Sequence, residues 1–120
     1  MKRTGPTNTE AQQLIATLKQ AGLRENAPVW TRIADDLEKP SRQRRIVNIY
    51  KLDKYAKDGD VIVVPGKVLG MGDMHRKVKV AAFTFSQQAV DKIHGAGGQT
   101  LAIHEVLQKN PKGKNVRILG

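Results

Sequence analysis

The first third of the chain holds two stretches in which apolar residues recur at intervals of three and four. The capping-box pattern Thr7-x-x-Glu10 precedes the first stretch and Gly22 follows it, so we predict a helix from about residue 8 to Ala21. A second helix is predicted to open at Asn26, with Pro28 in its first turn, and to end before the next proline. Both helices are amphipathic, which predicts that each buries one face.

The densest apolar run lies in the middle of the chain. Four consecutive β-branched residues, Val61 to Val64, show no alternation of polar and apolar positions, which predicts a strand covered on both faces. Pro65-Gly66 has the sequence of a type II turn, so we expect a sharp corner there, after which Lys67 to Leu69 leaves for a neighbouring edge. The glycines of Gly70-Met-Gly72 then allow the backbone to come close to another group.

The rest of the chain alternates strand and helix patterns. A long strand is predicted from 77 to 85, and Ser86 is the expected N-cap of a helix that ends near Gly95. The inner face of this helix is predicted to be Ala89, Val90 and Ile93. The other predicted elements are an extended piece at Ile46-Val47, a helix capped by Asn48 that buries Ile49, Leu52, Tyr55 and Ala56, a strand from Gln99 to Leu101, a helix marked by Ile103, Val106 and Leu107, and a closing strand with Val116, Ile118 and Leu119.

The order of these elements predicts the fold class. It is typical of an α/β domain with two helices in front. At 120 residues the chain has the length of one domain, which can bury a core without disulfides. We therefore expect a single domain over residues 1–120, with two N-terminal helices in 8–38, a basic segment at 39–45 and an α/β core over 46–120.

Composition limits the possible functions. The chain has no cysteine, which excludes disulfides, thiolate chemistry and sulfur-bound metals. It has no apolar run approaching 18 residues and no signal-like N-terminus, so we expect no membrane partner. The formal net charge of +10 is large for 120 residues and indicates a polyanionic partner, most simply nucleic acid.

The position of the charge is more informative than its sum. Residues 1–38 hold five basic and five acidic side chains, whereas residues 39–79 hold eleven and four, and residues 80–120 hold five and two. The arginines of Arg42-Gln-Arg-Arg45 have no acidic neighbour, which favours contact with phosphate oxygens, to which guanidinium offers a planar fork. His75-Arg76-Lys77 is predicted to form a basic loop tip. The lysines interpreted as a solvated helix face are Lys51, Lys54 and Lys57.

Other kinds of site lack the residues that they need. Gly66-Lys67 is followed by Val68, where a phosphate-binding Walker loop has Ser or Thr, and Gly70-Met-Gly72 has His75 where a dinucleotide fingerprint has its third glycine. The three histidines show no metal-ligand spacing, and the sequence contains no evident pair of catalytic carboxylates. We expect no enzyme, cofactor, metal or small-molecule substrate. Five aromatic residues are too few for a base-stacking platform, so binding is expected through the backbone and shape of the nucleic acid.

Several motifs together resemble one protein family. They are Val47-Asn-Ile49, the block from Asp60 to Gly72, the segment Val78-x-Val-Ala-Ala-Phe-x-Phe-Ser86-x-x-Ala89-x-x-x-Ile93, Gly97-Gly98, and Asn110-Pro-x-Gly113. Over nearly its whole length the chain resembles the L-eighteen-e family of archaeal and eukaryotic large-subunit ribosomal proteins. Its central and Gly-Gly segments are also similar to the C-terminal domain of the bacterial-type relative, L-fifteen. Ala102 departs from the pattern, because relatives often have a Ser there that would cap the last helix.

The resemblance implies an irregular β-β-α superhelical core that follows the two N-terminal helices. It also implies a structural role in assembly and translation on the large subunit of the cytoplasmic ribosome, with rRNA and neighbouring ribosomal proteins as partners. The short chain, without a basic extension, favours the archaeal type. The residues expected to contact rRNA are Lys2, Arg3, Lys39, Arg42, Arg44, Arg45, Lys67, His75, Arg76, Lys77, Lys112 and Lys114.

Two alternatives belong to other classes. The chain could be a free-standing DNA-binding or chromatin protein whose first two helices form a helix-turn-helix. The neutral charge of residues 1–38 counts against this, because a recognition helix should carry positive charge. An enzyme acting on nucleotides is disfavoured by the incomplete glycine motifs described above.

Overall fold

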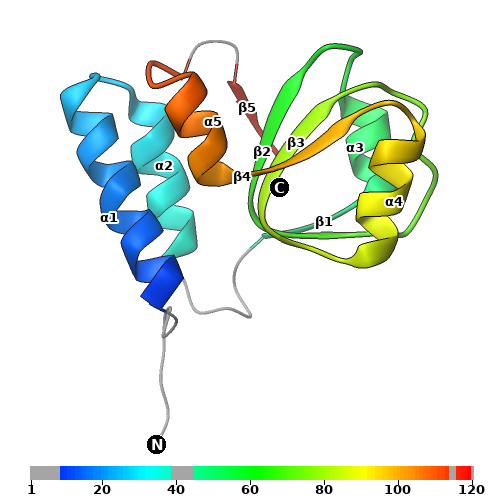
Figure 1. The fold of residues 1–120 in the computed structure, drawn as a ribbon, viewed down its shortest axis with the longest axis horizontal. Helices are drawn as coiled ribbons and strands as arrows, with labels where there is room; N and C mark the ends of the chain where they lie inside the picture. The colour runs from blue at the N-terminus through cyan, green and yellow to red at the C-terminus, as the bar shows by residue number, and fades with distance from the viewer. Residues whose placement is uncertain (1–8, 39–44, 114–115, 120) are drawn as a thin grey trace, which may run out of the picture.

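The computed structural model describes residues 9–38, 45–113 and 116–119, and its elements follow the predicted order (Figure 1). The helices are α1 (Thr9–Arg24), α2 (Pro28–Leu37), α3 (Ile49–Tyr55), α4 (Gln87–Gly95) and α5 (Ile103–Lys109). The strands are β1 (Arg45–Asn48), β2 (Val61–Leu69), β3 (Lys79–Phe85), β4 (Gln99–Ala102) and β5 (Val116–Ile118). Within these described ranges, no helix is long and apolar enough to cross a membrane.

All the strands lie in one parallel sheet, which confirms the predicted α/β class. The sheet has the order β1-β2-β3-β4, and β5 also pairs with β2. Val61–Val63 pairs with β5, whereas Gly66–Leu69 pairs with β1, and β3 lies along both halves. The strand β2 is therefore the centre of the sheet, with three partners.

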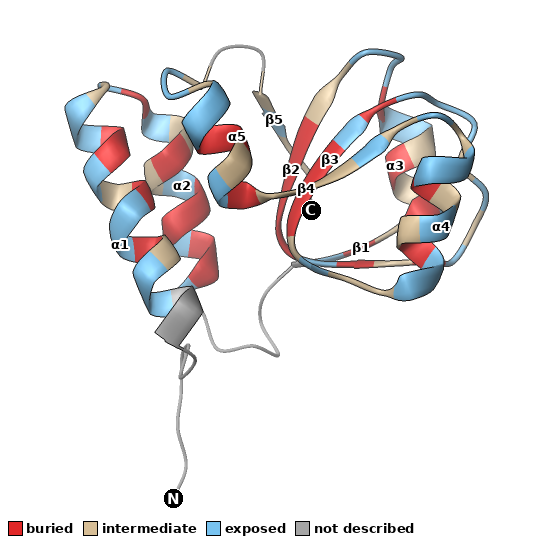
Figure 2. Cartoon of the chain, viewed as in Figure 1, coloured by how far each residue is buried: buried red, intermediate tan, exposed pale blue. Residues whose placement is uncertain are grey.

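Helices cover both faces of the sheet, as the unbroken apolar run predicts. One core lies between the sheet and the layer of α1, α2 and α5, and the other lies between the sheet and α3 with α4 (Figure 2). Successive residues of β2 enter different cores, because side chains alternate along a strand. Val63 packs in the first core, and Ile62 and Val64 pack in the second.

The prediction of a turn at Pro65-Gly66 is wrong. The strand β2 continues through both residues, and the pairing register with β3 shifts between Val64 and Lys67. A shift of this kind is a β-bulge or related irregularity, which bends a strand without ending it. Lys67 to Leu69 does reach a neighbouring edge, since this half pairs with β1. Pairing on both sides therefore outweighs the local turn preference.

The predicted end of the first helix is also wrong. Gly22 lies inside α1, and a Cβ there would press on the Thr31 hydroxyl and lie 3.3 Å from the Ala27 carbonyl oxygen. Close packing between α1 and α2 therefore requires glycine. The helix ends at Arg24 in a Schellman motif: Asn26 just beyond it has a φ of +52°, and the Ala27 N–H donates to the Gly22 carbonyl oxygen at 2.9 Å. Asn26 thus closes α1 and does not open α2.

The start of α4 follows the predicted chemistry, and the start of α5 shows how the missing cap at Ala102 is compensated. The Ser86 Oγ accepts a hydrogen bond of 3.2 Å from the Ala89 N–H, which confirms Ser86 as the N-cap of α4. Ala102 has no side-chain acceptor, and Glu105 compensates in part by accepting the Ala102 N–H at 2.7 Å. Two inner-face predictions differ from the structure: Val90 is half-buried, and the Tyr55 side chain is exposed.

A buried tryptophan holds the turn after α5. The Trp30 Nε1–H donates to the Pro111 carbonyl oxygen at 2.7 Å, across 81 residues of sequence. Gly113, with a φ of +69°, lies so close that a Cβ there would meet Val29. The turn that carries Lys112 is therefore fixed against α2.

The cap at Ser86 gives a stability test. Ser86→Ala removes the acceptor of the Ala89 N–H, and we expect the free energy of unfolding to fall by about 1 kcal/mol. Chemical denaturation measures the change. Ser86→Asn, which keeps a capping oxygen, should stay within a few tenths of a kcal/mol of the parent. Equal stability of the Ala variant and the parent would contradict the assigned cap.

Candidate nucleic-acid interface

Two cations of α1 are paired with carboxylates of the N-terminal helices and the turns that follow them. Lys19 Nζ lies 2.7 Å from Glu38 Oε2, and Arg24 Nε lies 3.5 Å from Glu25 Oε2. The hydrogen bond to Glu38 raises the pKa of Lys19. Exposed pairs of this kind contribute little to stability, but they neutralise the surface of α1 and α2. This layer therefore offers little net positive charge to a polyanion.

Cations of the sheet and its loops are arranged differently. Several form no ion pair with any residue that the structure describes. They are Lys51, Lys57, Lys67, Arg76, Lys77, Lys79, Lys109 and Lys112. Unpaired positive charge on this scale repels itself, so it is best accommodated against a polyanion.

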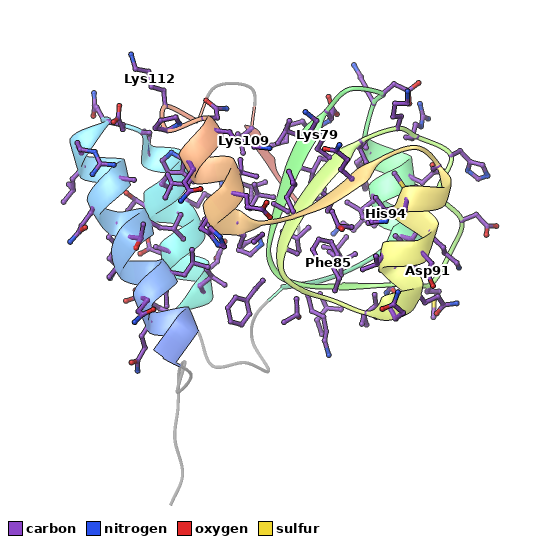
Figure 3. The ribbon with its side chains drawn as sticks, in the orientation of Figure 1. Lys79, Phe85, Asp91, His94, Lys109 and Lys112 are labelled. Carbon is purple, nitrogen blue, oxygen red and sulfur yellow. The ribbon has the colours of Figure 1, made fainter. Side chains whose placement is uncertain are left out.

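Three of these lysines lie near the start of β2 or β3, and two lie at and just after the end of α5; we call these five the amino edge: Lys57, Lys77, Lys79, Lys109 and Lys112. Lys79 is the first residue of β3, and Lys57 lies in the turn before β2. Lys109 ends α5, and Lys112 lies in the turn that leads toward β5. Figure 3 shows Lys79, Lys109 and Lys112 along the upper edge of the molecule. Four separate segments thus contribute charge to one edge.

Lys67 lies away from the amino edge, in the second half of β2. It is exposed and pairs in register with Ile46 on one side and Thr84 on the other. The exposed position of Lys67 agrees with the prediction that this residue contacts RNA. The prediction that the preceding run is buried is confirmed for Ile62 to Val64, whereas Val61 is half-buried. Through its backbone, Arg45 pairs with Gly66, one register position from Lys67, and we call these two positions the second basic edge.

The predicted loop tip at 75–77 is held by carboxylates. Asp53 accepts the His75 backbone N–H at 2.8 Å, and its second oxygen lies 3.0 Å from His75 Nδ1. The side-chain bond from His75 is the main reason that the pKa of Asp53 is lowered. Asp58 accepts the Lys77 N–H at 2.9 Å. The backbone of the tip is thus anchored while the side chains of Arg76 and Lys77 stay exposed.

Not every predicted contact residue can be placed. Lys2, Arg3, Lys39, Arg42, Arg44 and Lys114 lie outside the described residues. Arg45 is described through its backbone in β1. Of the rest, Lys77 and Lys112 come together on the amino edge, Lys67 does not, and His75 is tied to α3.

The glycine loop after β2 closes on the protein itself. Lys92 Nζ donates to the carbonyl oxygen of Gly70 at 2.8 Å and also to that of Gly72. Gly72 has a φ of +106°, and a Cβ there would collide with Tyr50 at the start of α3. The Asn48 side chain does not cap α3 but accepts the Met71 N–H at 3.3 Å. The close approach that these glycines permit therefore serves internal packing.

Arg117 also has an internal role. Its Nη1 donates to Asp60 Oδ2 at 2.8 Å and to the Tyr55 carbonyl oxygen at 3.0 Å, which joins β5 to the turn before β2. Asp60 also accepts the Lys57 N–H at 2.9 Å. The Lys57 N–H is the largest cause, and Arg117 a further one, of the lowered pKa of Asp60. Asp60 and Arg117 thus fix the turn that carries Lys57 against β5.

Sequence reasoning missed part of this edge. Lys79 and Lys109 were not among the expected contacts, and Lys57 was assigned to a solvated helix face. The alternation of Lys79 between Val78 and Val80 signals an exposed strand position, but it does not reveal which loops lie beside it. Their proximity depends on how the parallel strands are aligned.

The arrangement of α2 does not suit a recognition helix. Its inner face, with Trp30, Ile33 and Leu37, is buried in the core against the sheet. Its exposed positions include Arg32 and Asp35, and Glu38 follows at the C-cap. Elsewhere in the described ranges, no three His, Cys, Asp or Glu side chains are grouped to hold a metal.

The comparisons with known proteins identify the class to which this α/β fold with its basic edges belongs. The family model for "Ribosomal protein 60S L18 and 50S L18e" matches residues 7–120. The chain therefore belongs to this family of large-subunit ribosomal proteins, and the predicted resemblance is confirmed.

Individual relatives agree with this assignment. The large ribosomal subunit protein eL18 of Methanopyrus kandleri is 47% identical over 121 residues, covering 97% of the chain and 95% of the relative. The protein of the same name from Sulfurisphaera tokodaii is 44% identical over 117 residues, covering 98% and 96%. That of Methanococcus maripaludis is 43% identical over 119 residues, covering 99% of both. These relatives are archaeal, in agreement with the predicted archaeal type.

Asp60 predicts a specific acid sensitivity. Its folded-state pKa is lowered, so ionised Asp60 stabilises the fold above the ordinary Asp pKa of about 3.9, and this stability is lost as the pH falls through the folded value. We expect Asp60→Asn to be less stable than the parent at neutral pH, and the difference to shrink below about pH 4. Urea denaturation at a series of pH values measures the free energy of unfolding of each protein.

A matched control is Asp73→Asn. Asp73 is exposed and forms no ion pair with a described residue, so this variant should follow the parent throughout the titration. A constant difference between Asp60→Asn and the parent from pH 7 to pH 3 would show that ionised Asp60 does not stabilise the fold in the proposed way.

Proposed function

We propose that this protein is a structural constituent of the large ribosomal subunit that binds rRNA through its two basic edges. The observation that carries the proposal is the separation of charge between layers. Lys19 and Arg24 on α1 are paired with carboxylates, whereas the lysines of the amino edge form no ion pair with a described residue. The protein works in the cytoplasm, on the ribosome, where rRNA phosphates supply the missing counter-charge.

The chemistry of the edges favours contact with the RNA backbone. Lysine ammonium groups neutralise phosphates and release condensed counterions, which makes affinity strongly salt-dependent. Phosphate contacts position a protein on RNA without reading its sequence. The fold holds these lysines in position, because each lies at or within a few residues of the end of a helix or strand. Recognition then depends on the shape of folded rRNA.

Two edges on one rigid body suggest how the protein supports assembly. The amino edge lies where β2 begins, and Lys67 with Arg45 lies where β2 pairs with β1. A protein that binds RNA at both ends of its sheet can hold two rRNA segments at a constant distance. The neutral outer face of α1 and α2 is then available to neighbouring ribosomal proteins, since it carries little net charge.

The basic segment offers a direct test of rRNA binding. We expect the combined change Arg42→Gln, Arg44→Gln and Arg45→Gln to leave thermal unfolding unchanged and to weaken binding to large-subunit rRNA. If each arginine neutralises one phosphate, the slope of log affinity against log salt should become shallower by roughly two to three units. Filter binding across a salt series measures it.

The control removes positive charge from helices α1 and α2. Arg24→Gln with Arg32→Gln alters exposed cations of α1 and α2, and it should change the slope little. If the triple variant keeps both affinity and slope, the basic segment does not contact rRNA. Absence of salt-dependent binding by the parent protein would overturn the proposed function itself.

A further inference from the structure

A small notch lies within the amino edge, between three loops that are far apart in sequence. Gly59 before β2, residues 77–79 at the start of β3 and residues 97–99 at the start of β4 line a hollow of about 200 Å³. The hollow is smaller than typical small-molecule pockets, which have volumes of about 300–1,000 Å³. No aromatic side chain lines it on which a base could stack. Its size suits one phosphate group.

The floor of the notch is held by backbone hydrogen bonds. The Gly59 N–H donates to the Lys77 carbonyl at 2.8 Å, the Lys79 N–H to the Asp60 carbonyl at 3.0 Å, and the Gln99 N–H to the Val78 carbonyl at 3.0 Å. These bonds tie the three loops to one another. The hollow is therefore formed before any ligand arrives, which lowers the cost of ordering on binding.

The charge inside the notch is positive. Lys77 and Lys79 contribute exposed ammonium groups, and neither forms an ion pair with a described residue. Of the nearby carboxylates, Asp58 accepts the Lys77 backbone N–H beside the notch, and Asp60 accepts from Arg117 and the Lys57 N–H. No acidic residue lines the hollow. An anion is therefore the ligand that its electrostatics favour.

Glycines keep the notch open. Gly97 has a φ of +89°, and a Cβ there would lie 3.2 Å from the Lys77 Cε, so a larger residue would displace the lysine stem. A Cβ at Gly98 would collide with the Val78 carbonyl. Gly59 also has a φ of +89°, but a Cβ there meets nothing within 4 Å, because it would extend into open space. One wall can therefore be filled without disturbing the others.

We propose that this notch, formed by Gly59 and residues 77–79 and 97–99, binds a single phosphodiester of the RNA backbone through Lys77 and Lys79. This inference rests on the proposed rRNA-binding function and assigns one contact within it. The glycine backbones allow the phosphate and its sugars to approach the sheet closely, as a surface with side chains at these positions would not. The site reads no base, so the contact fixes the position of the strand.

Two kinds of variant test the notch by different physical routes. Lys77→Gln with Lys79→Gln removes its charge, whereas Gly59→Asn fills its open wall and leaves the net charge unchanged; Asn tolerates positive φ better than most residues. For loss of one phosphate contact we expect each variant to bind large-subunit rRNA about tenfold more weakly at 0.1 M salt, with a slope shallower by roughly one unit. Thermal unfolding checks that each variant is folded.

The matched control is Lys51→Gln with Lys54→Gln on α3, which removes the same charge outside the notch. It should retain most of the affinity. If the parent binds rRNA and both notch variants behave like this control, the proposed phosphate contact at the notch is overturned, while the proposed function stands. If the parent shows no salt-dependent rRNA binding, the proposed function fails first.

A measurement on the parent protein keeps the test independent of the variants. Acetylation with an amine-reactive ester, followed by mass spectrometry, reports the accessibility of each lysine. We expect Lys77 and Lys79 to become protected in the rRNA complex, with Lys51 still reactive. Equal reactivity in the free and bound states would overturn the proposal. Protection by inorganic phosphate alone, with none added by RNA, would identify a free-phosphate site and overturn the RNA assignment.

Discussion

Burial of β2 on both faces is the constraint on which the rest of the structure depends. Ile62, Val63 and Val64 are fully buried, in alternate cores, and full burial of one such side chain stabilises a fold by about 1.5–3 kcal/mol. A parallel sheet of this kind needs helices on each side. The layer of α1, α2 and α5 meets that need on one face, and α3 with α4 meets it on the other. Loss of either layer would expose half of the core.

This requirement explains how the surface is divided. The N-terminal helices are near neutral because their main task is to cover the sheet, and Lys19 and Arg24 of α1 are paired with carboxylates. Since helices occupy the faces, the edges where strands begin and end are left for recognition. Unpaired lysines gather at these edges, where loops can present them without disturbing the core. Stability and RNA recognition thus use different parts of the surface.

Local signals succeeded where local chemistry decides the outcome. Ser86 caps α4 because a hydroxyl oxygen and a nearby N–H suffice, and Val61 to Val64 form a strand, buried from Ile62 on, because no polar residue interrupts them. The same signals failed where distant segments compete. Pro65-Gly66 has turn chemistry, but pairing with β1 and β3 keeps it in a strand. Gly22 has the chemistry of a helix end, but close contact with Thr31 explains its presence inside α1.

The sequence by itself determined the α/β class, the order of the elements, the family and the net positive charge of residues 39–120. Periodicity, motifs and charge are properties of the chain alone. Tertiary structure decided which lysines share a surface. Lys57 and Lys79 are separated by more than twenty residues, and the parallel pairing of β2 with β3 brings their segments to the same end of the sheet. Likewise, Gly59 and Gly97 form one notch because β2, β3 and β4 all begin there, and no local pattern encodes that proximity.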